Sequence, residues 1–238
     1  MTLATDLRNG TSSLLELAER DLAAFWREVA VYEAAAYAGD LQARETLRAA
    51  LHDVLPALAG SYQDAAIALA AELYDLERDR LNTPGTYRAP GIEVPDGGHA
   101  LAGWALAEAV SPDGLHTLIG GALTRRVMKA ANGTVMHAAV ADPKAGGWYR
   151  VTRPKACDFC RFLAGRGDVY TRATVDFASH DHCHCIAAVA WGDSTGVLLD
   201  ANGKRLTRST AKTRTDDELR VIDNQNIRDW IESHPNSG

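Results

Sequence analysis

Cysteine and histidine side chains are concentrated in one short part of the 238-residue sequence. All 4 cysteines lie between Cys157 and Cys185. The first two, Cys157 and Cys160, have the C-x2-C spacing with which two thiolates hold one tetrahedral ion from a tight turn. The second half of the stretch, His180-Asp-His-Cys-His-Cys185, offers five more sulfur or nitrogen donors. The spacing therefore predicts a metal site that is closed by two separate turns.

Zinc is the metal that fits such donors best, and it takes four of them. We expect Cys157 and Cys160 on one side of the ion. The other side draws on Cys183 together with either His180 or Cys185. Four sulfur or nitrogen ligands leave no open coordination position, so the predicted role of the single zinc ion is structural rather than catalytic.

Other uses of the cysteines fit the sequence less well than zinc binding. A thioredoxin-like redox pair is disfavoured because no βαβ pattern precedes Cys157. A zinc deaminase needs H-x-E and P-C-x-x-C, whereas this sequence has no His-x-Glu and places Pro154 three positions before Cys157. Disulfide bonds remain an alternative if the protein meets oxidising conditions after synthesis.

The composition is that of an ordinary globular chain, with 46% hydrophobic and 24% charged residues. The formal net charge of −6 and the pI of about 5.7 argue against a protein that coats nucleic acid nonspecifically. The sequence contains no run of about eighteen apolar residues, so no transmembrane helix is expected, and the N-terminus lacks the features of a signal peptide. We therefore expect synthesis and folding in a reducing cytosol, where clustered cysteines more often bind metal than form disulfides.

The elements that must position this cluster are mostly helices. Ser13 and Glu16 can form a capping box at the start of a first helix, which Gly39 ends. Pro56 and Gly60 are expected to interrupt the following helical pattern. Apolar residues at three- and four-residue steps predict helices over residues 40–54, 61–81, 99–110 and 112–139.

The Pro- and Gly-rich segment 82–98 is expected to be a linker arm. Short strands are expected at 148–152 and 186–191, on either side of the cluster, whereas the loop 161–179 shows no clear helix or strand face. The tail is expected to be loop-like over 200–215 and to end in a short helix over 216–232. The predicted fold is mainly α, with an N-terminal helical bundle or hairpins followed by a small α+β lobe that carries a Cys/His metal knuckle. The predicted divisions are an N-terminal helical region 1–81, the arm 82–98, a region with the Cys/His cluster 99–199 and a polar tail 200–238.

The sequence ALTRRVMKAANGTVMHAAVADPKAGGWYRVTRPKACDFCRFLAGRGDVYT, followed by SHDHCHC, resembles the MuF-like minor capsid or head morphogenesis proteins of tailed bacteriophages, especially those of actinobacteria. The resemblance extends from about Leu123 to Trp191 and includes a helix with a basic face. His182 and His184 are extra to the family pattern and receive no ligand role from it. The positions that match are Asp142, Gly147, Trp148, Arg150, Val151, Cys157, Cys160, Arg166, Gly167, Tyr170, His180, Cys183 and Cys185.

The resemblance implies a structural virion protein that acts in head assembly. Its expected partners are the portal protein, the major capsid protein or both, with contact to packaged DNA a further option. Its expected location is the portal region or capsid interior of a virion that is assembled in the bacterial host cytoplasm. Neither a membrane nor a small-molecule substrate is expected.

A nucleic-acid-binding zinc module is the alternative function. Arg125, Arg126 and Lys129 give one helix a basic face that could serve it. Acidic and basic residues alternate in the cluster itself, however, and this balance disfavours strong phosphate binding. No Ser/His/Asp, P-loop or paired-carboxylate pattern is evident, so we do not expect an enzyme.

Overall fold

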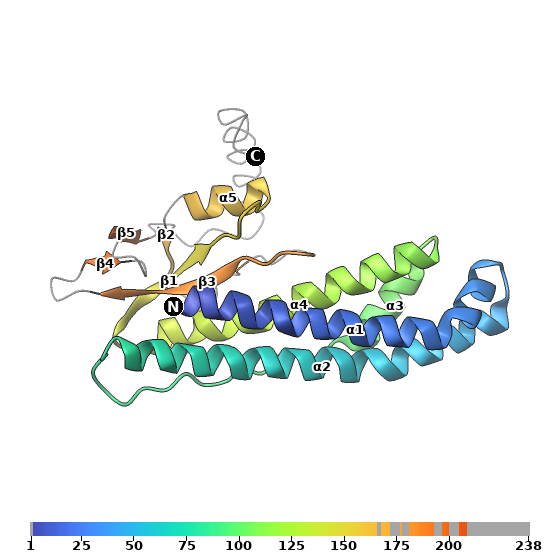
Figure 1. Ribbon diagram of the computed structural model, residues 1–238, viewed down its shortest axis with the longest axis horizontal. Coiled ribbons are helices and arrows are strands. Elements are labelled where there is room, and N and C mark those ends of the chain that lie inside the picture. The colour runs from blue at the N-terminus through green and yellow to red at the C-terminus, as the bar shows by residue number, and fades with distance from the viewer. Residues whose placement is uncertain are drawn as a thin grey trace.

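The structure, a computed structural model, describes residues 2–165, 168–171, 177, 181–192, 197–199 and 205–208. Four long or medium helices lie lengthwise beside one another, and a small sheet and one short helix sit at one end of them (Figure 1). The N-terminus lies at the same end as the sheet (Figure 1). The prediction of a mainly α fold with a small α+β lobe is confirmed.

The first helix, α1 (Leu3–Tyr37), begins ten residues earlier than the predicted capping box at Ser13. The Thr2 side chain caps it by accepting a hydrogen bond from the Thr5 backbone nitrogen. Leu3 and Leu7 are buried, so the apolar stripe of the helix already starts in its first turn. The capping prediction was wrong because Thr2 caps a helix that begins nearly three turns earlier and already buries Leu3 and Leu7 there.

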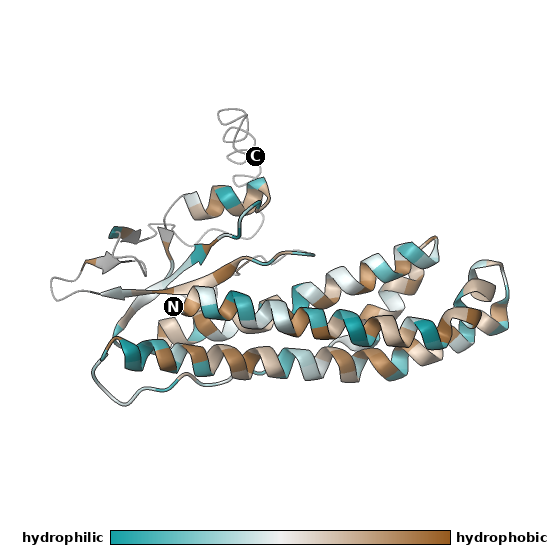
Figure 2. Cartoon of the chain, viewed as in Figure 1, coloured by the Kyte–Doolittle hydropathy of each residue, from teal (hydrophilic) through white to brown (hydrophobic). Residues whose placement is uncertain are grey.

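The second helix, α2 (Leu41–Arg80), runs without a break through Pro56 and Gly60, where the sequence predicts an interruption. Its buried positions continue at helical spacing across the proline, from Leu51 and Leu55 to Ala59. Packing of this stripe against α1 therefore outweighs the hydrogen bond that the proline removes. Apolar and polar residues both recur along α1 and α2, as expected of helices with one buried face (Figure 2).

The extended segment between α2 and α3 (Gly98–Glu108) lies against the bundle and is held there by side chains. Arg78 donates to the carbonyl oxygens of Thr83, Pro84 and Gly85, at 2.8–3.2 Å. Arg126 donates to the carbonyl oxygens of Asp96 and Gly97 at the other end, both at 3.0 Å. Helices on both sides of the segment share one apolar core. Whether the chain divides functionally at this arm stays a prediction.

The helix α4 (Pro112–Ala141) is the central element of the molecule. It packs against α1, α2 and α3 and also against the sheet. Ser111 caps its first turn by accepting from the Gly114 nitrogen, and Pro112 occupies the first helical position, where a missing N–H costs nothing. Sixteen of its residues are buried, so α4 is surrounded on most sides and links the helical bundle to the cysteine-bearing lobe.

The sheet contains β1 (Ala145–Val151), β3 (Ile186–Gly192), β4 (Leu198–Leu199), β5 (Arg205–Arg208) and β2 (Asp168–Val169), in that order. All neighbouring pairs are antiparallel except β5 and β2. A bridge between Trp148 of β1 and Tyr170, next to β2, joins the two ends of this order. The pairings between strands therefore form a closed ring, in which β1 and β3 each have a neighbour on both sides.

Both strands that the sequence predicts beside the cysteine cluster are present as β1 and β3. Two expectations about irregular structure were wrong. Part of the loop 161–179 belongs to the helix α5 (Asp158–Gly165), which buries Cys160 and Phe162, and the tail contributes β5 to the sheet. The terminal helix predicted over 216–232 lies outside the described residues.

The helix α2 is long enough and apolar enough to cross a membrane by length and composition alone. Core helices of globular proteins meet the same criterion. In this structure α2 packs against α1, α3 and α4, and it donates a hydrogen bond from Arg78 to Asp142 at the end of α4.

Candidate metal centre

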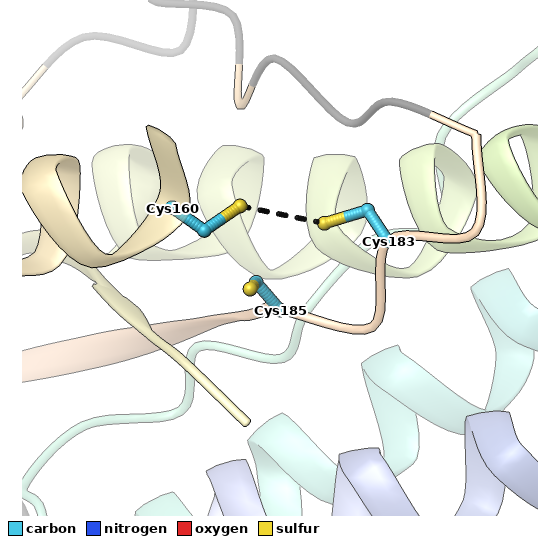
Figure 3. Close-up of side chains that lie close together, drawn as sticks. All are labelled: Cys160, Cys183 and Cys185. Carbon is cyan, nitrogen blue, oxygen red and sulfur yellow. Dashed lines mark hydrogen bonds between the residues drawn. The ribbon is translucent and has the colours of Figure 1, made fainter. Parts of the chain in front are cut away.

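Three of the four cysteines converge at the junction of α5, β3 and α4. Cys160 comes from the first turn of α5, Cys183 from the loop before β3, and Cys185 from the residue next to that strand, and the three thiols point toward one another (Figure 3). Their sulfur atoms all lie within 4.8 Å of one another, and Cys160 Sγ is 3.7 Å from Cys183 Sγ. Two sulfurs at about 2.3 Å from one tetrahedral ion lie about 3.8 Å apart, so this spacing suits a shared metal ion.

The same distance shows that the thiols are not joined covalently. A disulfide requires about 2.05 Å between sulfurs, and all 4 cysteines are free of disulfide bonds in this structure. Each of the three converging cysteines is at most 3% exposed. A metal ion bound by these three buried cysteines would be shielded from water, as in a structural site.

Asn132, in the middle of α4, positions the cysteine loop against the helix. Its side-chain nitrogen donates to the Cys185 carbonyl oxygen at 3.0 Å, and its oxygen accepts from the Ala187 nitrogen at 2.7 Å. Asn132 is fully buried, so both halves of its amide are used inside the protein. This pair of hydrogen bonds fixes the start of β3, and with it the backbone that carries Cys185.

Arg150 of β1 brings a positive charge to the thiol group. Its Nη1 lies 3.6 Å from Cys160 Sγ, its Nη2 donates to the Phe177 carbonyl oxygen, and its guanidinium carbon lies 3.8 Å from the centre of the Phe177 ring. Arg150 is buried, and in the described part of the chain no carboxylate forms an ion pair with it. A metal-bound thiolate at Cys160 is therefore the anion best placed to balance this charge.

Crowding of the three thiols disfavours their ionisation when no cation is bound. Hydrogen bonds with Cys183 and Cys185, followed by burial, raise the pKa of Cys160. For Cys185, the hydrogen bond with Cys160 lowers the pKa, but the contact with Cys183 and burial outweigh it, so the net shift is upward. A bound cation reverses this preference because it stabilises the thiolates directly.

The structure does not bring all predicted ligands into this group. Cys157 precedes α5 and is exposed, and it is not within the 4.8 Å cluster. His180 lies outside the described residues. The two extra histidines point elsewhere: His184 lines a small surface pocket beside α1, and His182 is exposed with a positive φ of 59°. The ligand set as a whole stays a prediction, with Cys160, Cys183 and Cys185 as the members that the fold brings together.

Asp142 connects the end of α4 to α2 and is completely buried. Its Oδ2 accepts from Arg78 Nε at 2.9 Å and from the Tyr74 hydroxyl at 3.2 Å, while Oδ1 accepts from the Lys144 nitrogen at 2.9 Å. Arg78 also holds the extended segment after α2, as described above. The carboxylate thus joins two helices, the arm and the turn into β1.

The Gly-Trp pair that follows holds the sheet closed. Gly147 has a φ of +124°, and a Cβ built on it would lie 2.3 Å from the Tyr170 carbonyl oxygen. This close approach lets the backbones of Trp148 and Tyr170 exchange two hydrogen bonds of 2.9 and 2.7 Å. The Trp148 ring is almost fully buried and stacks on Tyr170, with ring centres 4.6 Å apart.

Two of the basic residues on α4, Arg125 and Arg126, form contacts with other parts of the same chain. Arg125 forms an ion pair of 3.3 Å with Asp181, in the turn that leads to Cys183, and Arg126 holds the extended segment. Burial and the neighbouring Arg125 lower the pKa of Arg126, whereas Asp96 acts in the opposite direction. Arg125 thus supports the turn that leads to the cysteine cluster, and Arg126 supports the extended segment before α3.

Comparison with known proteins places this arrangement in a family. No curated protein and no solved structure matches the chain. The VG15 protein family matches residues 2–204, which include the helical bundle, the motif at the end of α4 and all four cysteines. VG15 is a family of viral and phage proteins, so the match indicates a phage protein but does not specify the MuF-like head morphogenesis type. The chain therefore belongs to the VG15 family of phage proteins.

Proposed function

We propose that this VG15 protein is a non-enzymatic structural component of the phage virion, a minor capsid or head morphogenesis protein of the MuF-like type. It acts in head assembly at the portal or in the capsid interior, with the portal or major capsid protein as its partner. The observation that carries the proposal is the family match over residues 2–204. The MuF-like motif positions, from Asp142 to Cys185, support the finer assignment.

The structural role of the motif residues also supports a protein that works as a scaffold. Asp142, Gly147 and Arg150 each hold one element against another: α4 against α2, β1 against the residue after β2, and β1 against α5. In the part of the chain that the structure describes, the one group of three or more potential metal-binding side chains is the buried cysteine group.

Zinc is the metal that we propose for this group. Thiolate ligands favour zinc, copper(I) or iron–sulfur clusters, and zinc tolerates the tetrahedral arrangement that a sulfur spacing of 3.7 Å implies. Cys157 or His180 supplies the fourth ligand. The ion joins α5 to the start of β3, two segments that the sheet alone does not connect directly.

The alternative of a nucleic-acid-binding zinc module has less support. Its predicted basic surface consists of Arg125, Arg126 and Lys129, and the two arginines are occupied by Asp181 and by the arm. The net charge of −6 also repels a phosphate backbone at long range.

Quantitative mass spectrometry of purified phage particles and of heads isolated before DNA packaging tests the proposal. The protein is expected in both, at a few copies per particle relative to the major capsid protein. Its absence from both samples would overturn the structural assignment. Salt-dependent binding of the purified full chain to duplex DNA, combined with that absence, would instead support the nucleic-acid-binding module.

A further inference from the structure

Two histidines from different helices meet away from the cysteine group. His52 comes from the first half of α2 and His99 from the first turn of α3. Their Nδ1 atoms are 3.2 Å apart, and their rings are nearly parallel, with an interplanar angle of 24° and centres separated by 5.4 Å. His52 is partly exposed and His99 is exposed, so the paired nitrogen atoms lie at the protein surface.

The backbone that carries this pair is fixed closely. A Cβ on Gly98 would lie 2.3 Å from the Pro56 nitrogen, so the start of α3 touches the α2 backbone one turn after His52. The Asp96 side chain accepts from the Gly98 nitrogen at 2.8 Å, and Arg126 donates to the Gly97 carbonyl oxygen from α4. The two imidazoles are therefore held together by rigid helices rather than by flexible loops, which is what a preorganised site requires.

From this geometry we propose a second metal site, in which His52 and His99 jointly bind one divalent transition-metal ion. Imidazole nitrogens bind such ions at about 2.0–2.1 Å, so two of them on one ion lie about 2.9–3.4 Å apart for angles between 90° and 109°. The Nδ1 separation of 3.2 Å falls within this range. For both lone pairs to meet at one ion, the rings would have to rotate slightly about their Cβ–Cγ bonds, and water would complete the coordination from the exposed side.

The donor set selects the class of metal. Neutral imidazole suits nickel, copper and zinc, whereas magnesium and calcium prefer oxygen ligands. With two protein ligands, this site binds more weakly than a three- or four-thiolate site, so zinc loads the cysteine group first. The ion links α3 to α2, and the site therefore stabilises the packing of the short helix on the bundle.

Nickel titration of the untagged full chain, reduced and already loaded with zinc, tests this site. Calorimetry is expected to show one Ni²⁺ per chain with no release of zinc. His52→Gln and His99→Gln should each reduce the affinity at least tenfold, since loss of even an outer hydrogen-bond partner costs about 10–100-fold. His137→Gln removes an exposed histidine on α4 and serves as the matched control with unchanged affinity.

A thermal melt gives an independent readout of the same proposal. Ni²⁺ is expected to raise the melting temperature of the wild-type chain and of His137→Gln, and to leave both α2/α3 variants unchanged. Absence of nickel binding in the wild type would show that the pair is only an N–H···N hydrogen bond and would overturn the proposal. Equal nickel affinity in the wild type and in both His52→Gln and His99→Gln would overturn it as well. Neither result bears on the cysteine group or on the role in head assembly.

Discussion

The guanidinium of Arg150 lies 3.6 Å from the sulfur of Cys160, so the sheet delivers a buried positive charge directly to the thiol group. A tetrahedral zinc ion with three or four thiolates carries a net negative charge, and a nearby guanidinium compensates for it. This relationship links two motifs that are separated in the sequence, the Gly-Trp-x-Arg segment and the C-x2-C pair. It explains why an arginine, whose charge cannot be lost inside a protein, stands on a strand that faces the cysteines.

Replacing Arg150 by Gln should weaken zinc binding by about 10–100-fold, because it removes the positive charge and the hydrogen bond to a ligand sulfur. Competition with a chromogenic chelator measures this change. Arg153→Gln is the matched control, because Arg153 is exposed and lines the pocket beside α1. An equal loss of affinity in both variants would mean that general charge, and not the contact with Cys160, is responsible.

Stability should depend on pH in opposite ways with and without metal. The pKa of Cys160 is raised in the metal-free fold by its thiol neighbours and by burial, whereas unfolded thiols ionise near pH 8.5. The reduced metal-free protein should therefore lose stability as pH rises from about 8 to 9.5. In the zinc-bound protein the cysteines are thiolates already, and stability should increase as pH rises toward 8.5.

Urea unfolding of the chelated and zinc-loaded chains at several pH values measures both trends. The range stays below pH 10 because burial, the Asp142 charge and its hydrogen bond also raise the pKa of Tyr74. Tyr74→Phe should leave the change of unfolding free energy with pH the same in both the chelated and the zinc-loaded chain. Identical pH dependence of the chelated and loaded proteins would show that the thiols do not ionise on metal binding.

Gly147→Ala should lower the free energy of unfolding by at least about 1–3 kcal/mol. The new methyl group would meet the Tyr170 carbonyl oxygen, and the positive φ is unfavourable for alanine. Gly192→Ala in β3 is the control, since nothing lies within 4 Å of the added Cβ and its φ is not positive. Denaturant unfolding compares the two variants. Equal stability would show that the Trp148–Tyr170 bridge contributes little.

Arg126→Gln should expose the extended segment to proteases, because it removes two hydrogen bonds to the carbonyl oxygens of Asp96 and Gly97. Thermolysin, which cuts beside apolar residues such as Val94, should then cleave between residues 82 and 98 faster than in the wild type. Arg125→Gln loses the ion pair with Asp181 and should leave this rate unchanged. First cleavage within α2 in the wild type would show that the arm is not the weakest segment.

The sequence predicted the helices and the two main strands because their burial follows regular spacing. Its cysteine spacing pointed to the right region, where the structure brings Cys160, Cys183 and Cys185 together, but Cys157 of the C-x2-C pair lies outside that group. It did not predict the continuity of α2 through Pro56, where long-range packing against α1 and α3 overrides the local effect of proline. For the same reason it placed the start of α1 too late, since the value of Thr2 as a cap depends on the burial of Leu3 and Leu7.

Several supporting residues of the candidate site could not be found from the sequence. Asn132 gave one weak signal, a polar residue within an apolar helical stretch, but its bonds to Cys185 and Ala187 join residues more than 50 positions apart. The contact between Arg150 and Cys160 depends on how α5 folds over β1, whereas the sequence predicts a loop from residue 161 onward. The basic face of α4 was visible, whereas its partners Asp181 and the arm carbonyls were not.

The metal content of the untagged full chain, purified under reducing conditions without chelator, tests the central claim most directly. Native mass spectrometry should find one zinc ion per chain in the wild type and none in Cys183→Ser or Cys185→Ser. Cys157→Ser should lose zinc if that residue supplies the fourth ligand, and should keep it if His180 does. A wild-type chain that carries no metal, while amide exchange shows β1 and β3 to be fully protected, would contradict the zinc centre.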